Sequence, residues 1–140
     1  MSFLSLTTII QSEKAEKETI EAQLTNNSLD IRLKQKTSSN EADMINTQCN
    51  EEVAQIRNEM AQMDDKTCDE YKELMNEIEE LKDERDRKLS KIESEATDYE
   101  TIKDTENQTL QSRLEAVSAD IESYEEARQG NIEDSFGYFQ

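Results

Sequence analysis

The sequence predicts an all-α protein: a long coiled-coil helix, with a shorter N-terminal helix folded back on it as an antiparallel helical hairpin. The 140 residues include no Pro and only two Gly, so the chain lacks the residues that mark the many turns of a β-rich or α/β fold. Only 33% of the residues are hydrophobic, too few for a thick core. Those residues nevertheless recur with a helical period, which a disordered chain would not maintain.

Residues 1–35 are predicted to form an amphipathic N-terminal helix whose apolar residues concentrate at its two ends. The seven residues 34–40 are all polar, and Ser38 with Glu41 has the spacing of a capping box, which marks the start of a helix. Lysines at 34 and 36 suit the C-terminal end of the preceding helix. We therefore expect a turn at 36–40.

Residues 41–129 are predicted to form the long coiled-coil helix. One apolar seam can be followed through it in steps of three and four residues, and 18 of its 22 positions are apolar, against seven of the other 54 positions in 53–128. The average step of about 3.57 residues lies between the coiled-coil and free-helix periods, and the stripe is narrow, as in a coiled coil. The seam consists of Val53, Ile56, Met60, Met63, Thr67, Tyr71, Leu74, Ile78, Leu81, Arg85, Leu89, Ile92, Ala96, Tyr99, Ile102, Glu106, Leu110, Leu114, Val117, Ile121, Tyr124 and Arg128.

A second apolar row supports the hairpin. It consists of Ala54, Ala61, Cys68 and Met75 and widens the apolar face only as far as about residue 75. An N-terminal helix folded back at 36–40 would cover roughly 43–75 and bring Phe3 and Leu4 close to Tyr71 and Met75. Alternatively, these small residues are simply helix formers and no hairpin exists.

The long helix has one weak stretch and one expected end. Residues 104–109 are polar, so a bend or a second hairpin could occur there, although the lack of Gly and Pro favours a straight helix. Gly130 suits the C′ position that ends a helix. We therefore expect 130–140 to form a separate aromatic C-terminal tail.

The composition argues against enzymatic, metal and nucleic-acid functions. The chain has no His, which removes the commonest general base and transition-metal ligand, and its acidic clusters lack the Gly of a calcium loop. We therefore expect no catalytic residues, no cofactor, no metal and no small-molecule substrate. The net charge of −18 opposes binding to nucleic acid or to anionic membranes. Residues 93–134 are the most one-sided part, with 13 acidic and three basic residues.

The two cysteines and the N-terminus bear on location. Cys49 and Cys68 would lie roughly 28 Å apart on one helix at ~1.5 Å per residue, so they cannot bridge each other there. We interpret them as small buried hydrophobic residues, with an interchain disulfide or a redox site as the alternative. There is no transmembrane run and no signal-peptide pattern. We expect a cytoplasmic protein by default, or export by a route independent of a signal peptide.

The function predicted from these features is that of a structural or interaction protein that forms homo-oligomers through the seam. The apolar ends of the chain are expected to dock protein partners or neighbouring subunits. Two alternatives stay open: a secretion-type chaperone or adaptor, and a subunit of a filamentous or virion assembly. The expected docking residues are Phe3, Leu4, Leu6, Phe136, Tyr138 and Phe139.

Overall fold

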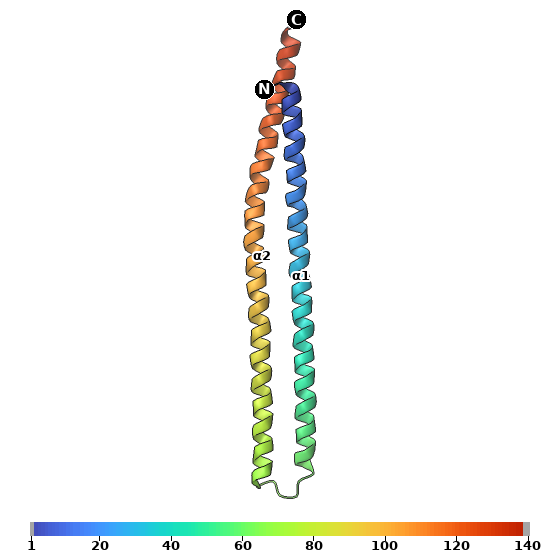
Figure 1. Cartoon of the computed structure of the whole chain (residues 1–140), viewed down its shortest axis with the longest axis vertical. Helices are drawn as coiled ribbons and strands as arrows, with labels where there is room; N and C mark the ends of the chain where they lie inside the picture. The colour runs from blue at the N-terminus through green and yellow to red at the C-terminus, as the bar shows by residue number, and fades with distance from the viewer. Residues whose placement is uncertain (1, 139–140) are drawn as a thin grey trace. The chain divides into compact units, whose positions relative to one another are not determined.

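Two helices make up almost all of the described chain (Figure 1). The computed structural model describes the backbone of residues 2–138 and the side chains of residues 2–134. Helix α1 is Phe3–Ala61 and helix α2 is Asp69–Tyr138, and no strand occurs within this described part. The helices pack against each other, which confirms the prediction of an all-α helical hairpin.

The hairpin divides into two units, which we describe separately. The turn unit is Ile31–Glu100 and contains the connection between the helices. The terminal unit comprises the described parts of Met1–Asp30 and Thr101–Gln140. Each unit has its own apolar core, contributed by one segment of α1 and one segment of α2.

The core of the turn unit lies where the last four turns of α1 face the first turns of α2. Residues of α1 at steps of three and four are buried here against Ile78, because that spacing places them along one face of the helix. Tyr71, Leu74 and Leu81 pack around the same cluster as half-buried residues. The α1 members are Cys49, Val53, Ile56 and Met60.

The core of the terminal unit is built in the same way. Ile20 of α1 is buried against Val117 and Ile121 of α2, and Leu24, Leu110 and Leu114 pack against this cluster. Leu6 and Ile10 continue the buried face of α1 toward its start. Fully burying an isoleucine is worth about 1.5–3 kcal/mol, so these few residues contribute much of the pairing energy of the unit.

Residues 62–68 connect the helices without glycine or proline. The Asp65 carboxylate accepts hydrogen bonds from the Thr67 hydroxyl (2.7 Å) and the Thr67 backbone N–H (2.9 Å), a local arrangement that competes with helix formation. These two bonds, the hydroxyl bond foremost, hold the pKa of Asp65 below its ordinary value of 3.8. The segment therefore turns through side-chain hydrogen bonding.

Helix α2 begins with a sulfur cap. The Tyr71 N–H donates to the Cys68 Sγ at 3.4 Å, so the cysteine occupies the N-cap position that Ser, Thr, Asp or Asn usually takes. Asp69 and Glu70 follow in the first turn, where negative charge favours the helix dipole. At the start of α1, Ser2 fills the corresponding position, and its Oγ accepts from the Ser5 N–H at 3.1 Å.

The predicted turn at 36–40 is wrong, and so is a long helix spanning 41–129. Helix α1 continues through 36–40, and the connection lies at 62–68. The polar segment stays helical because it contains no glycine or proline. In addition, the side chains on its inner face can pack beside α2. Lys34 places its ammonium 5.9 Å from the centre of the Tyr99 ring, and Ser38 is half-buried.

The pairing expected for the N-terminal helix is also wrong. Phe3 packs beside Arg128, with the guanidinium 5.9 Å from the ring centre, whereas Tyr71 packs against the end of α1. In place of the expected first helix, residues 49–60 of α1 cover the start of α2. Helix α2 runs unbroken through 104–109, so a second hairpin there is excluded, and residues 110–121 pack on α1.

Gly130 does not end α2, contrary to the prediction. The helix continues to Tyr138, and no described glycine has a positive φ. A C′ glycine stops a helix by adopting the left-handed conformation, which Gly130 does not do. The residues 130–138 are therefore part of α2, while residues 139–140 lie outside the described chain.

Candidate interaction surfaces

The predicted seam belongs to two helices and not to one. Its members from Val53 to Met63 lie at the end of α1 and in the connection, and its members from Tyr71 onward lie on α2. The first group faces the second within the turn unit. All the apolar seam residues predicted for 53–124 are buried or half-buried, except Ile102, which is 59% exposed.

The seam shifts by one residue in the polar middle of α2. Ile102 and Glu106 were predicted to lie in it, but Lys103 and Asn107 are the half-buried residues, whereas Ile102 and Glu106 are exposed. The α1 residue that faces this part of α2 is polar, and a buried polar residue requires hydrogen-bonding partners.

That polar residue is Asn27, which is 8% exposed and faces α2. Its amide donates to Asn107 Oδ1 at 2.9 Å and to a Glu106 carboxylate oxygen at 3.3 Å. Its own oxygen accepts from Lys103 Nζ at 3.4 Å, and this ammonium lies 3.7 Å from an Asp30 carboxylate oxygen. The network satisfies a buried amide and links the helices of the terminal unit through polar contacts.

Helix α1 also has a seam, which the apolar pattern of the sequence does not reveal. From Val53 the same steps of three and four lead back through residues that the structure places on the inner face of the helix. Polar residues interrupt this row, so its apolar content alone does not reveal it. Its members, buried or half-buried, are Leu6, Ile10, Glu13, Lys17, Ile20, Leu24, Asn27, Ile31, Lys34, Ser38, Ala42, Ile45 and Cys49.

The predicted N-terminal docking residues behave differently from one another. Phe3 and Leu4 are 49% and 74% exposed, so they form an apolar surface on the first turn of α1. Leu6, two residues further, is 3% exposed and belongs to the core of the terminal unit. Only the first two are therefore available to a partner in this structure.

The predicted C-terminal docking residues lie outside the described side chains. Phe136 and Tyr138 fall within the backbone of α2, but their side chains are not described, and Phe139 lies beyond the described chain. Just before them, Glu133 and Asp134 are exposed. In the sequence these two carboxylates precede the aromatic residues, with Ser135 between Asp134 and Phe136.

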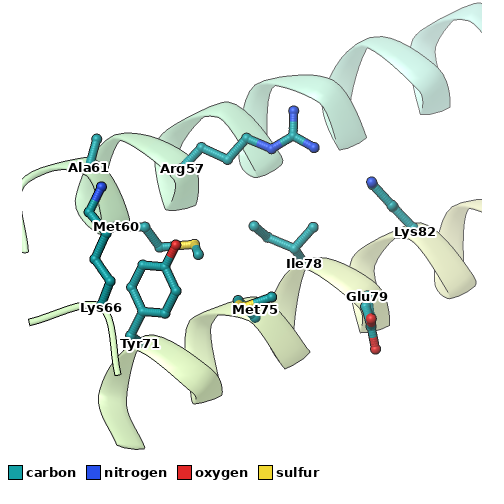
Figure 2. A pocket seen from close by; sticks show the side chains of 9 residues that line it. All are labelled: Arg57, Met60, Ala61, Lys66, Tyr71, Met75, Ile78, Glu79 and Lys82. Carbon is teal, nitrogen blue, oxygen red and sulfur yellow. The ribbon is translucent and has the colours of Figure 1, made fainter. Parts of the chain in front are cut away.

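A groove lies beside the connection in the turn unit, and we call it the turn groove (Figure 2). It encloses about 450 Å³ between the end of α1 and the start of α2. Its apolar side chains are those of Met60, Ala61, Tyr71, Met75 and Ile78. Its charged side chains are those of Arg57, Lys66, Lys82 and Glu79.

The cysteines are both unbridged. Cys49 is buried in the core of the turn unit, where its Sγ lies 3.7 Å from the Leu81 carbonyl oxygen. This agrees with the interpretation of Cys49 as a small hydrophobic residue. Cys68 differs, because it is half-buried at the connection and takes part in capping α2.

Among the described residues, no three or more Cys, Asp and Glu side chains gather in a group that could hold a metal ion. Neither described helix contains a stretch long and apolar enough to cross a membrane. Comparisons of the chain with protein-family models, with curated proteins and with solved structures found no match.

Proposed function

We propose that this chain is a structural interaction protein without enzymatic activity, which associates with further copies of itself and docks protein partners through its apolar ends. The observation that carries the proposal is the exposure of Phe3 and Leu4 at the start of α1. Both belong to the first turn of α1, so two large apolar side chains are exposed close to the start of the helix.

The exposed surface at the N-terminus is energetically significant for association. Covering a leucine that is 74% exposed would remove most of its side chain from water, and full burial is worth about 1.5–3 kcal/mol. The phenylalanine adds a large ring of which the hairpin covers about half. A partner that covers both therefore gains more than one supported by exposed ion pairs, which contribute about 0–1 kcal/mol each.

The hairpin changes the reason for expecting association. A single long helix with an apolar seam requires a second chain, because its seam has nothing else to pack against. In the hairpin the seam residues of α1 and α2 cover each other within one chain. The proposal therefore rests on the apolar residues that remain exposed and no longer on the seam.

The test is the mass of the protein in solution as a function of concentration, measured by sedimentation equilibrium. We expect reversible association for the wild-type chain and a roughly tenfold weaker association for Leu4→Asp, because the new charge cannot be buried without a large desolvation cost. Leu29→Asp is the matched control. Leu29 lies on the same helix and is also exposed, at 54%, but does not adjoin the N-terminal surface.

Each outcome has a distinct meaning. A strictly monomeric chain up to millimolar concentration contradicts self-association. Equal weakening by Leu4→Asp and Leu29→Asp would mean that association does not depend on the N-terminal end. A discrete oligomer supports the structural role, and unlimited growth with concentration favours the filament-forming alternative. A partly unfolded monomer would favour the chaperone or adaptor alternative.

A further inference from the structure

The lining of the turn groove carries more positive than negative charge, although the protein as a whole is acidic. The chain has a net charge of −18, yet three cationic side chains and only one carboxylate line this groove. The cations come from three places: Arg57 on α1, Lys66 in the connection and Lys82 on α2. Only the fold brings them together, since 25 residues separate the first from the last.

These three cations are also without carboxylate partners among the described residues. Other basic side chains form ion pairs at about 3 Å, including Lys14 with Glu125 and Lys88 with Glu84. Within residues 2–134, no Asp or Glu lies within ion-pair distance of Arg57, Lys66 or Lys82. The groove therefore presents three cationic side chains that form no ion pair with the described residues.

The floor of the groove is apolar and partly open to water. Met60 is buried beneath it, Tyr71 is half-buried, and Met75 is 49% exposed (Figure 2). Methionine side chains adapt their shape to an incoming group and make favourable contacts with aromatic rings. A peptide that fits this surface therefore has an apolar or aromatic side chain for the floor of the groove. It also has carboxylates beside or before that side chain in its sequence, which would face the cations.

The last residues of the sequence form a segment of this chemistry. Residues 132–139 read Ile-Glu-Asp-Ser-Phe-Gly-Tyr-Phe, so two acidic residues precede three aromatic ones, with Ser135 between the two groups. The chain is only 5% aromatic, so this is a concentration of aromatic residues. It also ends the most acidic part of the sequence, with 13 acidic and three basic residues in 93–134.

We propose that the turn groove of one copy binds the acidic aromatic segment 132–139 of a second copy. This inference rests on the proposed self-association and adds to it a second contact, which involves neither Phe3 nor Leu4. Glu133 and Asp134 would face the rim cations, and an aromatic side chain would cover Met75 and Tyr71. The groove and the segment are different surfaces. When two copies associate through one such contact, the groove of one copy and the segment of the other therefore remain unoccupied. The contact is head-to-tail and adds copies in succession until a ring closes.

The first experiment reverses charges and then restores them. Lys82→Glu and Glu133→Lys should each weaken association roughly three- to tenfold in sedimentation equilibrium, since each turns an attraction into a repulsion. The double variant should recover most of the loss, because it exchanges the two signs. The control is Lys91→Glu, an exposed residue on the same helix that makes the same charge change away from the groove. Circular dichroism checks that every variant keeps its helix content.

The second experiment identifies the two surfaces in contact. A photo-reactive benzoylphenylalanine replaces Met75, and this protein is mixed with a nitrogen-15-labelled wild-type copy before illumination and trypsin digestion. Arg128 is the last basic residue, so the segment is released as the peptide 129–140. The expected product joins the peptide that contains position 75 to a labelled peptide 129–140.

The remaining outcomes overturn the proposal in distinguishable ways. Links only between unlabelled peptides would place the segment in the groove of its own chain. Links to other labelled peptides, or a Lys82→Glu effect no larger than that of Lys91→Glu, would leave self-association standing while removing this contact. A chain that stays monomeric at all concentrations would remove both the contact and the proposed function.

Discussion

Asn27 shows how a single residue influences the pairing of two helices. It is buried at a seam position of α1 and finds partners only from residues on α2, chiefly Asn107 at 2.9 Å. A buried amide without partners costs about 1–3 kcal/mol, so a displaced register that left it unpaired would be penalised. Polar residues at seam positions are known to favour one register at some cost in stability.

The pair Asn27 and Asn107 can be tested by a double-mutant cycle. We expect Asn27→Leu alone to lower the free energy of unfolding by about 1 kcal/mol, because it removes the buried amide that donates to the half-buried Asn107. The double variant Asn27→Leu with Asn107→Leu should be as stable as the wild type or about 1 kcal/mol more stable, since both polar groups become apolar. Urea denaturation followed by circular dichroism measures each corner.

The outcome that contradicts this account is additivity. If the double variant loses as much stability as the two single variants together, the two amides are not energetically coupled. The hydrogen bond between them then contributes nothing to the free energy of unfolding. Leu29→Ala is a suitable control on the same helix, since Leu29 is 54% exposed and its truncation should change stability by less than about 0.5 kcal/mol.

Among the helical elements, the position of the connection between α1 and α2 could not be predicted from the sequence. The seam steps from Met63 through Thr67 to Tyr71, so the apolar period passes through the connection without a change of phase. The segment has no glycine or proline, and what breaks the helix is the pair of hydrogen bonds between Asp65 and Thr67. Such side-chain bonds also occur in sequences that remain helical, which is why periodicity did not reveal this turn.

The rejected turn at 36–40 shows the opposite error. That segment has a capping-box spacing and no apolar residue, yet it stays helical inside α1. A polar segment needs a strong local alternative to leave a helix, and here long side chains such as Lys34 still pack on the partner helix. The helical class and most apolar seam residues could be predicted from period and composition. The turn groove could not, because it depends on which segments the hairpin brings together.

The cap of α2 supports a prediction about Cys68, the residue that precedes the helix. Sulfur is a weak hydrogen-bond acceptor, so Cys68→Ser should raise the free energy of unfolding by about 0.5–1 kcal/mol by giving the Tyr71 N–H a better partner. The same substitution at Cys49 should lower it by about 1 kcal/mol, because it places a hydroxyl in an apolar core. Urea denaturation under reducing conditions compares the two variants.

The opposite signs make this comparison decisive. The two substitutions are chemically identical and both lie in the turn unit, so a general effect of removing a thiol would move both in the same direction. A Cys68→Ser variant that is less stable than the wild type would show that the sulfur packs as an apolar group and does not act as a cap.

For the whole molecule, the dominant electrostatic term is the excess of acidic residues. A net charge of −18 on 140 residues repels itself, and unfolding relieves that repulsion. The ion pairs between helices, such as Arg113 with Glu16 at 3.1 Å, join exposed side chains and therefore offset only a small part of it. Repulsion should therefore outweigh pairing in how the protein responds to salt.

This balance predicts that salt stabilises the hairpin. The screening length falls from about 30 Å at 0.01 M salt to about 3 Å at 1 M, so sodium chloride should weaken the repulsion over that range. We expect the melting temperature, followed by circular dichroism at one protein concentration, to rise by roughly 5 °C. Near the isoelectric point of about 4.3 the same salt series should have little effect, because the net charge is then small. A melting temperature that falls with salt at neutral pH would mean that the ion pairs stabilise the hairpin more than the repulsion destabilises it. The excess of acidic residues would then matter for the binding of partners and not for the stability of the hairpin.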